Sequence, residues 1–150
     1  MTREQVEGGS VTGERTASIP ILLVDDQRFV GIAVQRLLSS EQDLELHRCE
    51  VAGEAIAQAN RIQPALIFQD IRMPDTDGLA LVRLFRNNPA TASTPIIVLS
   101  ANDDAEARAG AAAAGANEYV VKLPKRDDLV SCIRRHLSAG AARSAAPSTL

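Results

Sequence analysis

The chain of 150 residues has the length of one domain, and its composition, 45% hydrophobic and 23% charged, is that of a soluble globular protein. Its formal net charge is −3 and its basic residues are scattered, so it lacks the positive face that nucleic acid requires. No apolar run has the length of a signal peptide or a membrane span. We therefore expect a cytoplasmic protein that contacts neither nucleic acid nor a membrane directly.

The cysteines, the histidines and a short basic cluster are each explained without a functional role. Cys49 and Cys132 match no metal-binding or redox spacing, so we expect both to be reduced, partly buried thiols. His47 and His136 are expected to be structural or exposed. A short basic cluster near the C-terminus is interpreted as a solvated helix face; it consists of Lys125, Arg126, Arg134 and Arg135.

Both ends of the chain are predicted to be flexible. Residues 1–18 are rich in Gly, Ser, Thr and charge, and residues 139–150 in Ala, Gly, Ser, Pro and Thr. Neither segment carries enough large apolar side chains to offset the entropy of ordering it. The folded domain is therefore expected at residues 19–138.

Between the ends, short apolar runs alternate with helical patterns. The apolar runs predict buried parallel strands at residues 19–24, 44–47, 65–68, 96–99 and 119–121. The second run alternates Leu with polar residues, as an edge strand does. The helical patterns, with apolar residues at spacings of three and four, lie at residues 28–39, 53–61, 79–85, 105–114 and 127–137.

This alternation predicts an α/β fold. Five strands and five helices in turn give a five-stranded parallel sheet, doubly wound by right-handed crossovers in the flavodoxin-like order 2-1-3-4-5. The fourth helix is unusual because it is almost entirely Ala, with Gly110 inside it. Alanine favours helix but buries little surface, so we expect this helix to be loosely anchored.

Reactive side chains follow four of the predicted strands at their carboxyl ends, where open parallel sheets bind ligands. They are Asp25, Asp26, Asp70, Ser100 and Lys122. Each has a structural alternative when taken singly. Asp26 and Ser100 could cap the helices that follow them, Asp70 could belong to a turn, and Lys122 could lie on the surface. Taken together, the five residues are better explained as a site.

Three carboxylates at one edge repel one another unless a cation is present. We expect Mg²⁺, with Mn²⁺ as an alternative, because such hard cations take oxygen ligands, and not zinc, because no His or Cys stands near. Asp70 could then act as a nucleophile toward phosphorus. Lys122 could neutralise phosphoryl oxygens and Ser100 could donate to one of them. Tyr119 is either a plain strand aromatic with its hydroxyl at the surface or a ring that moves inward when Ser100 shifts.

Four ordered segments around these residues resemble CheY-like receiver domains of two-component response regulators. They are ILLVDD at 21–26, FQDIRMPDTDG at 68–78, IIVLSA at 96–101 and GANEYVVK at 115–122, and the resemblance covers about residues 19–137. It implies that Asp70 is the phosphoacceptor and that Asp70 and Lys122 are the catalytic residues. It further implies a Mg²⁺ site made by Asp25, Asp26, Asp70 and the backbone carbonyl of Arg72, and a phosphate-contacting or switch set made by Ser100, Tyr119 and Lys122.

The resemblance also implies partners. A histidine kinase or phosphotransfer protein would supply the phosphoryl group. Because the Ala-rich fourth helix is expected to be loosely anchored, we further expect phosphorylation to shift an equilibrium between two arrangements of the fourth and fifth helices and the fifth strand. The readout would be a downstream protein or output domain, or a homodimer formed through that face.

One segment departs from the receiver pattern. Many receivers have Pro directly after the lysine, whereas here Leu123 precedes Pro124, so any cis peptide is expected at Leu123–Pro124. The Lys-Leu-Pro sequence, with Gln69 before the aspartate and residues 88–91, is similar to receivers of Wsp-type diguanylate cyclase regulators. No cyclase motif follows, so the chain is either a stand-alone receiver or a fragment of a larger regulator.

Two rival functions belong to other classes. A Mg²⁺-dependent phosphohydrolase of the haloacid-dehalogenase type would also use an aspartyl phosphate, but it carries a second acid two residues later, where Arg72 stands here. A degenerate receiver that only binds partners is the other rival, and the complete acidic set argues against it. The sequence therefore predicts a signalling switch rather than an enzyme.

Overall fold

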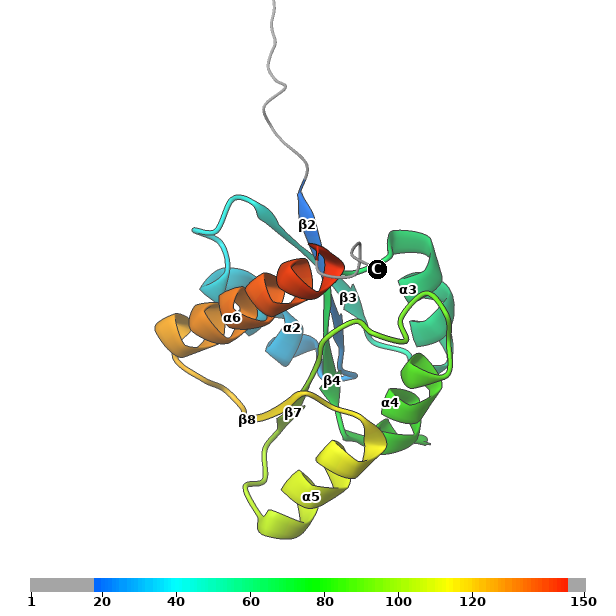
Figure 1. Cartoon of the computed structure of the whole chain (residues 1–150). Helices are drawn as coiled ribbons and strands as arrows, with labels where there is room; N and C mark the ends of the chain where they lie inside the picture. Colours follow the sequence, from blue (N-terminus) through cyan, green and yellow to red (C-terminus); the bar gives the residue numbers. More distant parts are fainter. Residues whose placement is uncertain (1–17, 146–150) are drawn as a thin grey trace, which may run out of the picture.

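The computed structural model describes residues 18–145, with side chains through residue 140. A parallel sheet forms its centre and helices cover both faces (Figure 1). The predicted leader, except Ser18, and the last five residues of the predicted tail lie outside the described residues. Within the described part, none of the helices has the length and apolar character that a bilayer span needs.

The sheet has five parallel strands: β2 (Ile19–Val24), β3 (Leu44–Cys49), β4 (Leu66–Asp70), β7 (Ile96–Ser100) and β8 (Glu118–Val121). Their order, β3-β2-β4-β7-β8, is the predicted 2-1-3-4-5. The strand predicted for an edge, β3, does lie at one edge. In the register, Asp70 pairs with Leu99 and Ser100 with Val121, so the carboxyl ends of neighbouring strands meet.

Five α-helices lie where the sequence predicts them: α2 (Arg28–Leu37), α3 (Ala55–Ile62), α4 (Gly78–Arg86), α5 (Ala105–Ala114) and α6 (Arg126–Ala145). Figure 1 shows α2 and α6 on one face of the sheet and α3 and α4 on the other. The crossover from β3 passes β2 to reach β4 and reverses the direction of winding, so the fold is doubly wound, as predicted.

Alternate strand residues enter two apolar layers. Neighbours such as Ile21 and Leu22 face opposite helices, since side chains in a strand alternate with a period of two. One layer lies under α3, α4 and α5. The other, called the α6 layer below, lies under α2 and α6 and consists of Ile21, Leu23, Val30, Val34, Leu38, Leu66, Phe68, Ile97, Leu99, Leu129, Cys132 and Ile133.

The structure also differs from the sequence-based prediction at three places. A short antiparallel pair, β5 (Arg72–Met73) and β6 (Thr76–Asp77), follows β4, and a 3-10 turn, η1 (Ala52–Glu54), precedes α3. Elements of two or three residues leave no periodic pattern to detect. The helix α6 continues to Ala145, past its predicted end at residue 137 and into the predicted tail. Four of the eight residues beyond position 137 are Ala, the strongest helix former.

The Ala-rich helix α5 buries only Ala111 and Ala114 among its residues. It has a specific contact with α4, because a Cβ added at Gly110 would lie 3.2 Å from Leu79 Cδ1. Glycine at this position therefore lets the two helices approach closely. The expected weak anchoring of this helix fits its small buried side chains, which contribute little hydrophobic stabilisation.

Candidate functional site

Three carboxylates converge at the carboxyl edge of the sheet, as predicted. Asp25 and Asp26 follow β2, and Asp70 is the last residue of β4. One carboxylate oxygen of each lies within 4.8 Å of the other two. Asp25 is 3% exposed and Asp70 is 2% exposed. These three residues, called the acidic site below, are brought together because the ends of adjacent parallel strands coincide.

The side chain of Lys122 enters the acidic site from the end of β8. Its Nζ lies 2.9 Å from Asp25 Oδ2 and 3.4 Å from Asp70 Oδ1. It also donates to Gln27 Oε1 at 3.1 Å. The lysine side chain is 8% exposed, so the alternative of a surface lysine is wrong. One ammonium thus contacts two of the three carboxylates.

The carboxyl group of Asp70 has a raised pKa. Burial is the main cause, and the neighbouring carboxylate of Asp25 adds to it. The backbone N–H of Arg72, which donates to Asp70 Oδ1 at 3.2 Å, and the ammonium of Lys122 offset part of this rise in pKa. The hydrogen bond from Arg72 gives Asp70 the local turn geometry expected for it, but its other neighbours show that it is more than a turn residue.

Two helix-capping alternatives are also excluded. The helix α2 begins after Gln27, which makes no side-chain cap, and Asp26 Oδ1 is buried without a hydrogen-bond partner in the described residues. The helix α5 is capped by Asp104, whose carboxylate accepts from Ala107 N–H at 2.6 Å. Asp26 therefore does not cap α2, and Ser100, at the end of β7, does not cap α5.

The acidic site fits a hard divalent cation. Its donors are all oxygen atoms, and the excess of carboxylates over ammonium groups leaves negative charge to be neutralised. The buried oxygen Asp26 Oδ1 has no hydrogen bond to satisfy it, which is costly unless a ligand occupies that position. Each of these observations agrees with the Mg²⁺ expected from the sequence.

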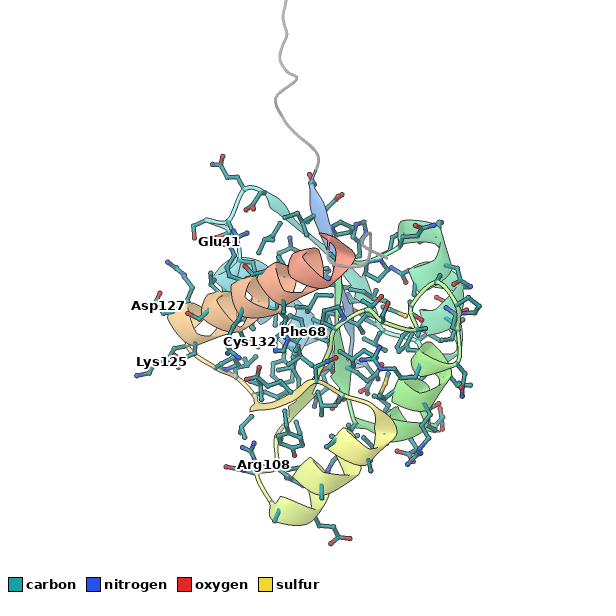
Figure 2. All side chains as sticks on the ribbon, viewed as in Figure 1. Glu41, Phe68, Arg108, Lys125, Asp127 and Cys132 are labelled. Atoms are coloured by element: carbon teal, nitrogen blue, oxygen red, sulfur yellow. The ribbon has the colours of Figure 1, made fainter. Side chains whose placement is uncertain are left out.

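A hydrogen-bonded chain leads from the acidic site toward α5. The buried Ser100 Oγ accepts from the backbone N–H of Asn102 at 3.1 Å. The carbonyl of Asn102 accepts from the hydroxyl of Tyr119 at 2.5 Å. The guanidinium of Arg108, which Figure 2 labels on α5, lies 4.8 Å from the centre of the Tyr119 ring. Tyr119 is thus buried, with its hydroxyl bonded, rather than placed at the surface.

Arg72 extends the same chain on its other side. The side-chain amide of Asn102 faces the Arg72 guanidinium, and the orientation that satisfies both groups has the amide oxygen accepting from Arg72 Nε at 3.2 Å. Asn102 therefore contacts Ser100, Tyr119 and Arg72 through three different groups. Any displacement of Asn102 changes the surroundings of all three residues.

Three residues near the site were missed or given no role by sequence reasoning. Gln27 bonds Lys122, and its position two residues after Asp25 was the available signal. Gly78 lies so close to Asp70 that a Cβ would collide with the aspartate carbonyl oxygen. Gln69 is fully buried and donates to the Asp70 carbonyl at 2.8 Å. Its signal was a polar residue in an apolar run.

The peptide bond after the lysine corrects one prediction. The cis bond lies at Lys122–Leu123 and not at Leu123–Pro124. The prediction followed from the general restriction of cis bonds to X–Pro pairs. Here the bond after Lys122 is cis although Leu123 stands where many receivers have proline.

Residues 21–134 match the family model of the response regulator receiver domain. The chain belongs to this family. The receiver is 34% identical to a protein-glutamate methylesterase/protein-glutamine glutaminase of Shewanella frigidimarina, over 81% of this chain and 32% of that protein. It is 27% identical to protein PilG of Pseudomonas aeruginosa, over 83% of this chain and 91% of that protein.

Solved structures agree with the family. A response regulator from Desulfuromonas acetoxidans is 31% identical and superposes with a TM-score of 0.72, covering 81% of this chain and 98% of that one. The receiver spans about a third of the length of the methylesterase relative and most of the length of PilG. Receivers are signalling switches that generally hold Mg²⁺ in an acidic pocket and interact with histidine kinases or phosphotransfer proteins and with output domains. The acidic site is a cluster of carboxylates of that kind.

Proposed function

We propose that this receiver accepts a phosphoryl group on Asp70 from a histidine kinase or phosphotransfer protein of the cytoplasm. The observation that carries the proposal is the setting of Asp70, a buried carboxylate within reach of two further carboxylates and the Lys122 ammonium. Burying such charge costs stability, and a function is the usual reason to keep it.

Asp25, Asp26 and Asp70, with the backbone carbonyl of Arg72, would hold Mg²⁺, for which Mn²⁺ can substitute. When bound, the cation supplies positive charge against the oxygens of the incoming phosphoryl group. The unpartnered Asp26 Oδ1 supports this assignment, since it provides a free carboxylate oxygen inside the site. Lys122, which already contacts Asp70 Oδ1, would contribute a second positive charge to the same oxygens.

In the transfer itself, a carboxylate oxygen of Asp70 forms the new P–O bond while the P–N bond of the phosphohistidine donor breaks. The electron pair of that bond stays on the imidazole nitrogen of the donor. The backbone N–H of Arg72 and the Lys122 ammonium hold the carboxylate in position before the attack. The product is an aspartyl phosphate, a covalent form known for carboxylate nucleophiles.

The switch would run through the chain from Ser100 to Tyr119. A phosphoryl oxygen on Asp70 offers the Ser100 hydroxyl a charged acceptor, which is a stronger partner than a neutral group. Turning toward it would break the bond from the Asn102 N–H to Ser100 Oγ. Asn102 also holds the Tyr119 hydroxyl, so the rearrangement reaches β8 and the weakly anchored α5.

The output would be a downstream partner, an output domain or a homodimer formed through α5, β8 and α6. A second candidate is a receiver that controls an enzyme within one larger protein, because the methylesterase relative matches over about a third of its length. In both cases the receiver itself would act as the switch and not as the catalyst of substrate turnover.

The test uses acetyl phosphate with Mg²⁺ and intact mass measurement. The parent chain is expected to gain the mass of one phosphoryl group, and Asp70→Asn is expected to gain none. Asp75→Asn is the matched control, because Asp75 lies exposed in the loop that follows Asp70. It should be phosphorylated like the parent. Equal phosphorylation of Asp70→Asn and the parent would contradict the proposal.

The same preparations test the switch. Amide spectra recorded with beryllofluoride and Mg²⁺ should change at residues 100–102 and 119 in the parent and not in Asp70→Asn. Changes confined to the acidic site would contradict the path through Asn102. Light scattering with and without beryllofluoride then separates self-association from binding to another protein.

A further inference from the structure

A second cluster of metal-ligating side chains lies between β8 and α6, apart from the acidic site. Glu118 begins β8, and Cys132 and His136 stand four residues apart on α6, so the two helix residues lie on the same helix face. One ligand atom of each lies within 4.8 Å of the other two. Figure 2 labels Cys132 on α6 beside the sheet, in agreement with its place in the α6 layer.

The three side chains meet at one oxygen. Cys132 Sγ lies 3.6 Å from Glu118 Oε1, and His136 Nε2 lies 2.7 Å from the same atom. Ligand atoms in a tetrahedral zinc site are about 3–4 Å apart, so small side-chain rotations would place all three around one cation. No such cation could reach a fully enclosed cluster, but the side chains of Glu118 and His136 are 29% and 17% exposed.

We propose that Glu118, Cys132 and His136 form a binding site for one Zn²⁺ ion or a cation of similar ligand preference, with a water molecule as fourth ligand. Thiolate, imidazole and carboxylate are the groups that zinc takes, and three protein ligands plus water is an established zinc arrangement. This donor set differs from the all-oxygen acidic site, so the two sites are expected to select different metals.

Binding of a divalent cation would change the charge balance of the cluster. Burial, followed by the neighbouring Glu118 carboxylate, raises the pKa of the Cys132 thiol to about 12, so without metal the thiol keeps its proton. Burial also acts to raise the pKa of Glu118, but hydrogen bonds from His136 and Arg135 outweigh it, and the carboxyl pKa is lowered. A bound cation would replace the thiol proton, giving a neutral set of one dication and two anions.

Arg135 is the competing group. It donates to Glu118 Oε1 at 2.9 Å, so an ordinary ion-pair network could also account for the position of the carboxylate. However, Arg135 is 60% exposed and can move to the second carboxylate oxygen, where it would orient the ligand from outside. Removing the Cys132 thiol distinguishes the two explanations. An ion-pair network keeps its contacts without the thiol, whereas a metal site loses its sulfur ligand.

The experiment titrates the full chain with Co²⁺ and then with Zn²⁺, with Mg²⁺ in excess. Bound Co²⁺ is expected to show a thiolate-to-cobalt absorption band, which an all-oxygen site cannot give, and one equivalent of Zn²⁺ should remove it. Cys132→Ser is expected to lose the band. His136→Gln and Glu118→Gln should each weaken binding at least about 10-fold, since changes outside the ligand shell already cost this much.

The chain offers matched controls, because it has only two Cys and two His residues. Cys49→Ser and His47→Gln remove the other member of each pair, which lies on β3, and should leave the band and the affinity unchanged. If Cys132→Ser does not fold, as judged by circular dichroism, the partly exposed His136→Gln variant decides. The proposal is overturned if the parent chain shows no thiolate band, or if His136→Gln binds as tightly as the parent.

Discussion

The α6 layer and the acidic site both include residues of strand β4, but burial has opposite effects on stability in these two regions. Phe68 and Asp70 lie two residues apart and are both buried, so they face the same side of the sheet. Phe68 contributes to the α6 layer, where burying apolar surface stabilises the fold. Asp70 belongs to the acidic site, where burying charge costs stability. The α6 layer stabilises the fold, whereas the acidic site lowers its stability and, under the proposed function, is kept for phosphoryl transfer.

Truncation in the α6 layer should have the largest effect. Ile133 is fully buried there, so Ile133→Ala is expected to lower the free energy of unfolding by about 2–5 kcal/mol. Urea unfolding followed by circular dichroism measures this. Ile32 on α2 is 40% exposed, so Ile32→Ala should cost less than about 1 kcal/mol. Equal losses for the two variants would mean that α6 is not a principal anchor.

Neutralising Asp70 should change the free energy of unfolding in the opposite direction. Without divalent cations at neutral pH, Asp70→Asn is expected to raise the free energy of unfolding by about 1–3 kcal/mol, because it removes a buried charge that is poorly compensated. The folded state raises the pKa of Asp70, so it binds the proton better than the unfolded state does. The stabilisation that proton binding to Asp70 gives the parent chain is therefore fully present below the pKa of this group in the unfolded state. It is lost as the pH rises through the pKa of Asp70 in the folded state.

The advantage of Asp70→Asn should accordingly grow from acid to neutral pH and shrink when Mg²⁺ is added. Unfolding curves at several pH values, with and without Mg²⁺, measure both trends. Asp75→Asn serves as the control and should follow the parent at every pH. An Asp70→Asn chain less stable than the parent at neutral pH without metal would contradict the contrast between the two regions.

The helix α5 provides an intermediate case. Ala111→Gly should lower the free energy of unfolding by about 1–2 kcal/mol, through helix propensity and the loss of one buried methyl group. Ala112→Gly, at an exposed position, loses propensity alone and should cost about 1 kcal/mol. Amide hydrogen exchange should show α5 opening at lower free energy than α6. Equal protection of the two helices would remove the argument that α5 is weakly anchored.

The smallest effect is expected at the surface of α6. Arg134 lies 2.7 Å from Asp43 and 2.9 Å from Glu41, which Figure 2 labels, but its side chain is 38% exposed. Arg134→Gln should therefore cost less than about 1 kcal/mol, and less again at high salt. The hydrogen bond from Arg134 lowers the pKa of Asp43, so this small contribution is present above the unfolded pKa and is lost as pH falls through the folded pKa.

The sequence was sufficient for the sheet and for the members of the acidic site. Apolar runs without alternation reveal buried parallel strands, and strand ends meet at one edge, so the sequence pattern alone groups the three carboxylates of the acidic site with Lys122. Gln27 and Gly78 were not given roles, because a contact distance at a loop depends on backbone geometry that no periodic pattern encodes. The two-residue strands β5 and β6 were missed for the same reason.

The cluster of Glu118, Cys132 and His136 shows a different limit of sequence reasoning. Spacing alone gave Cys132 no partner, because the ligating groups come from a strand and from a helix that packs on it. Only the packing of α6 against β8 brings the thiol within 3.6 Å of Glu118. The residues of the acidic site all follow ends of parallel strands, so the sequence pattern groups them, whereas the residues of this cluster share no such rule. The likeness to Wsp-type receivers stays a prediction.

The most direct test of the account is to locate the phosphoryl group. The receiver is phosphorylated with acetyl phosphate and Mg²⁺ and treated with borohydride, which reduces an aspartyl phosphate to homoserine, and the peptides are sequenced by mass spectrometry. The account predicts homoserine at position 70 and unchanged aspartate at positions 25 and 26. Homoserine at either of those positions, with Asp70 intact, would contradict it.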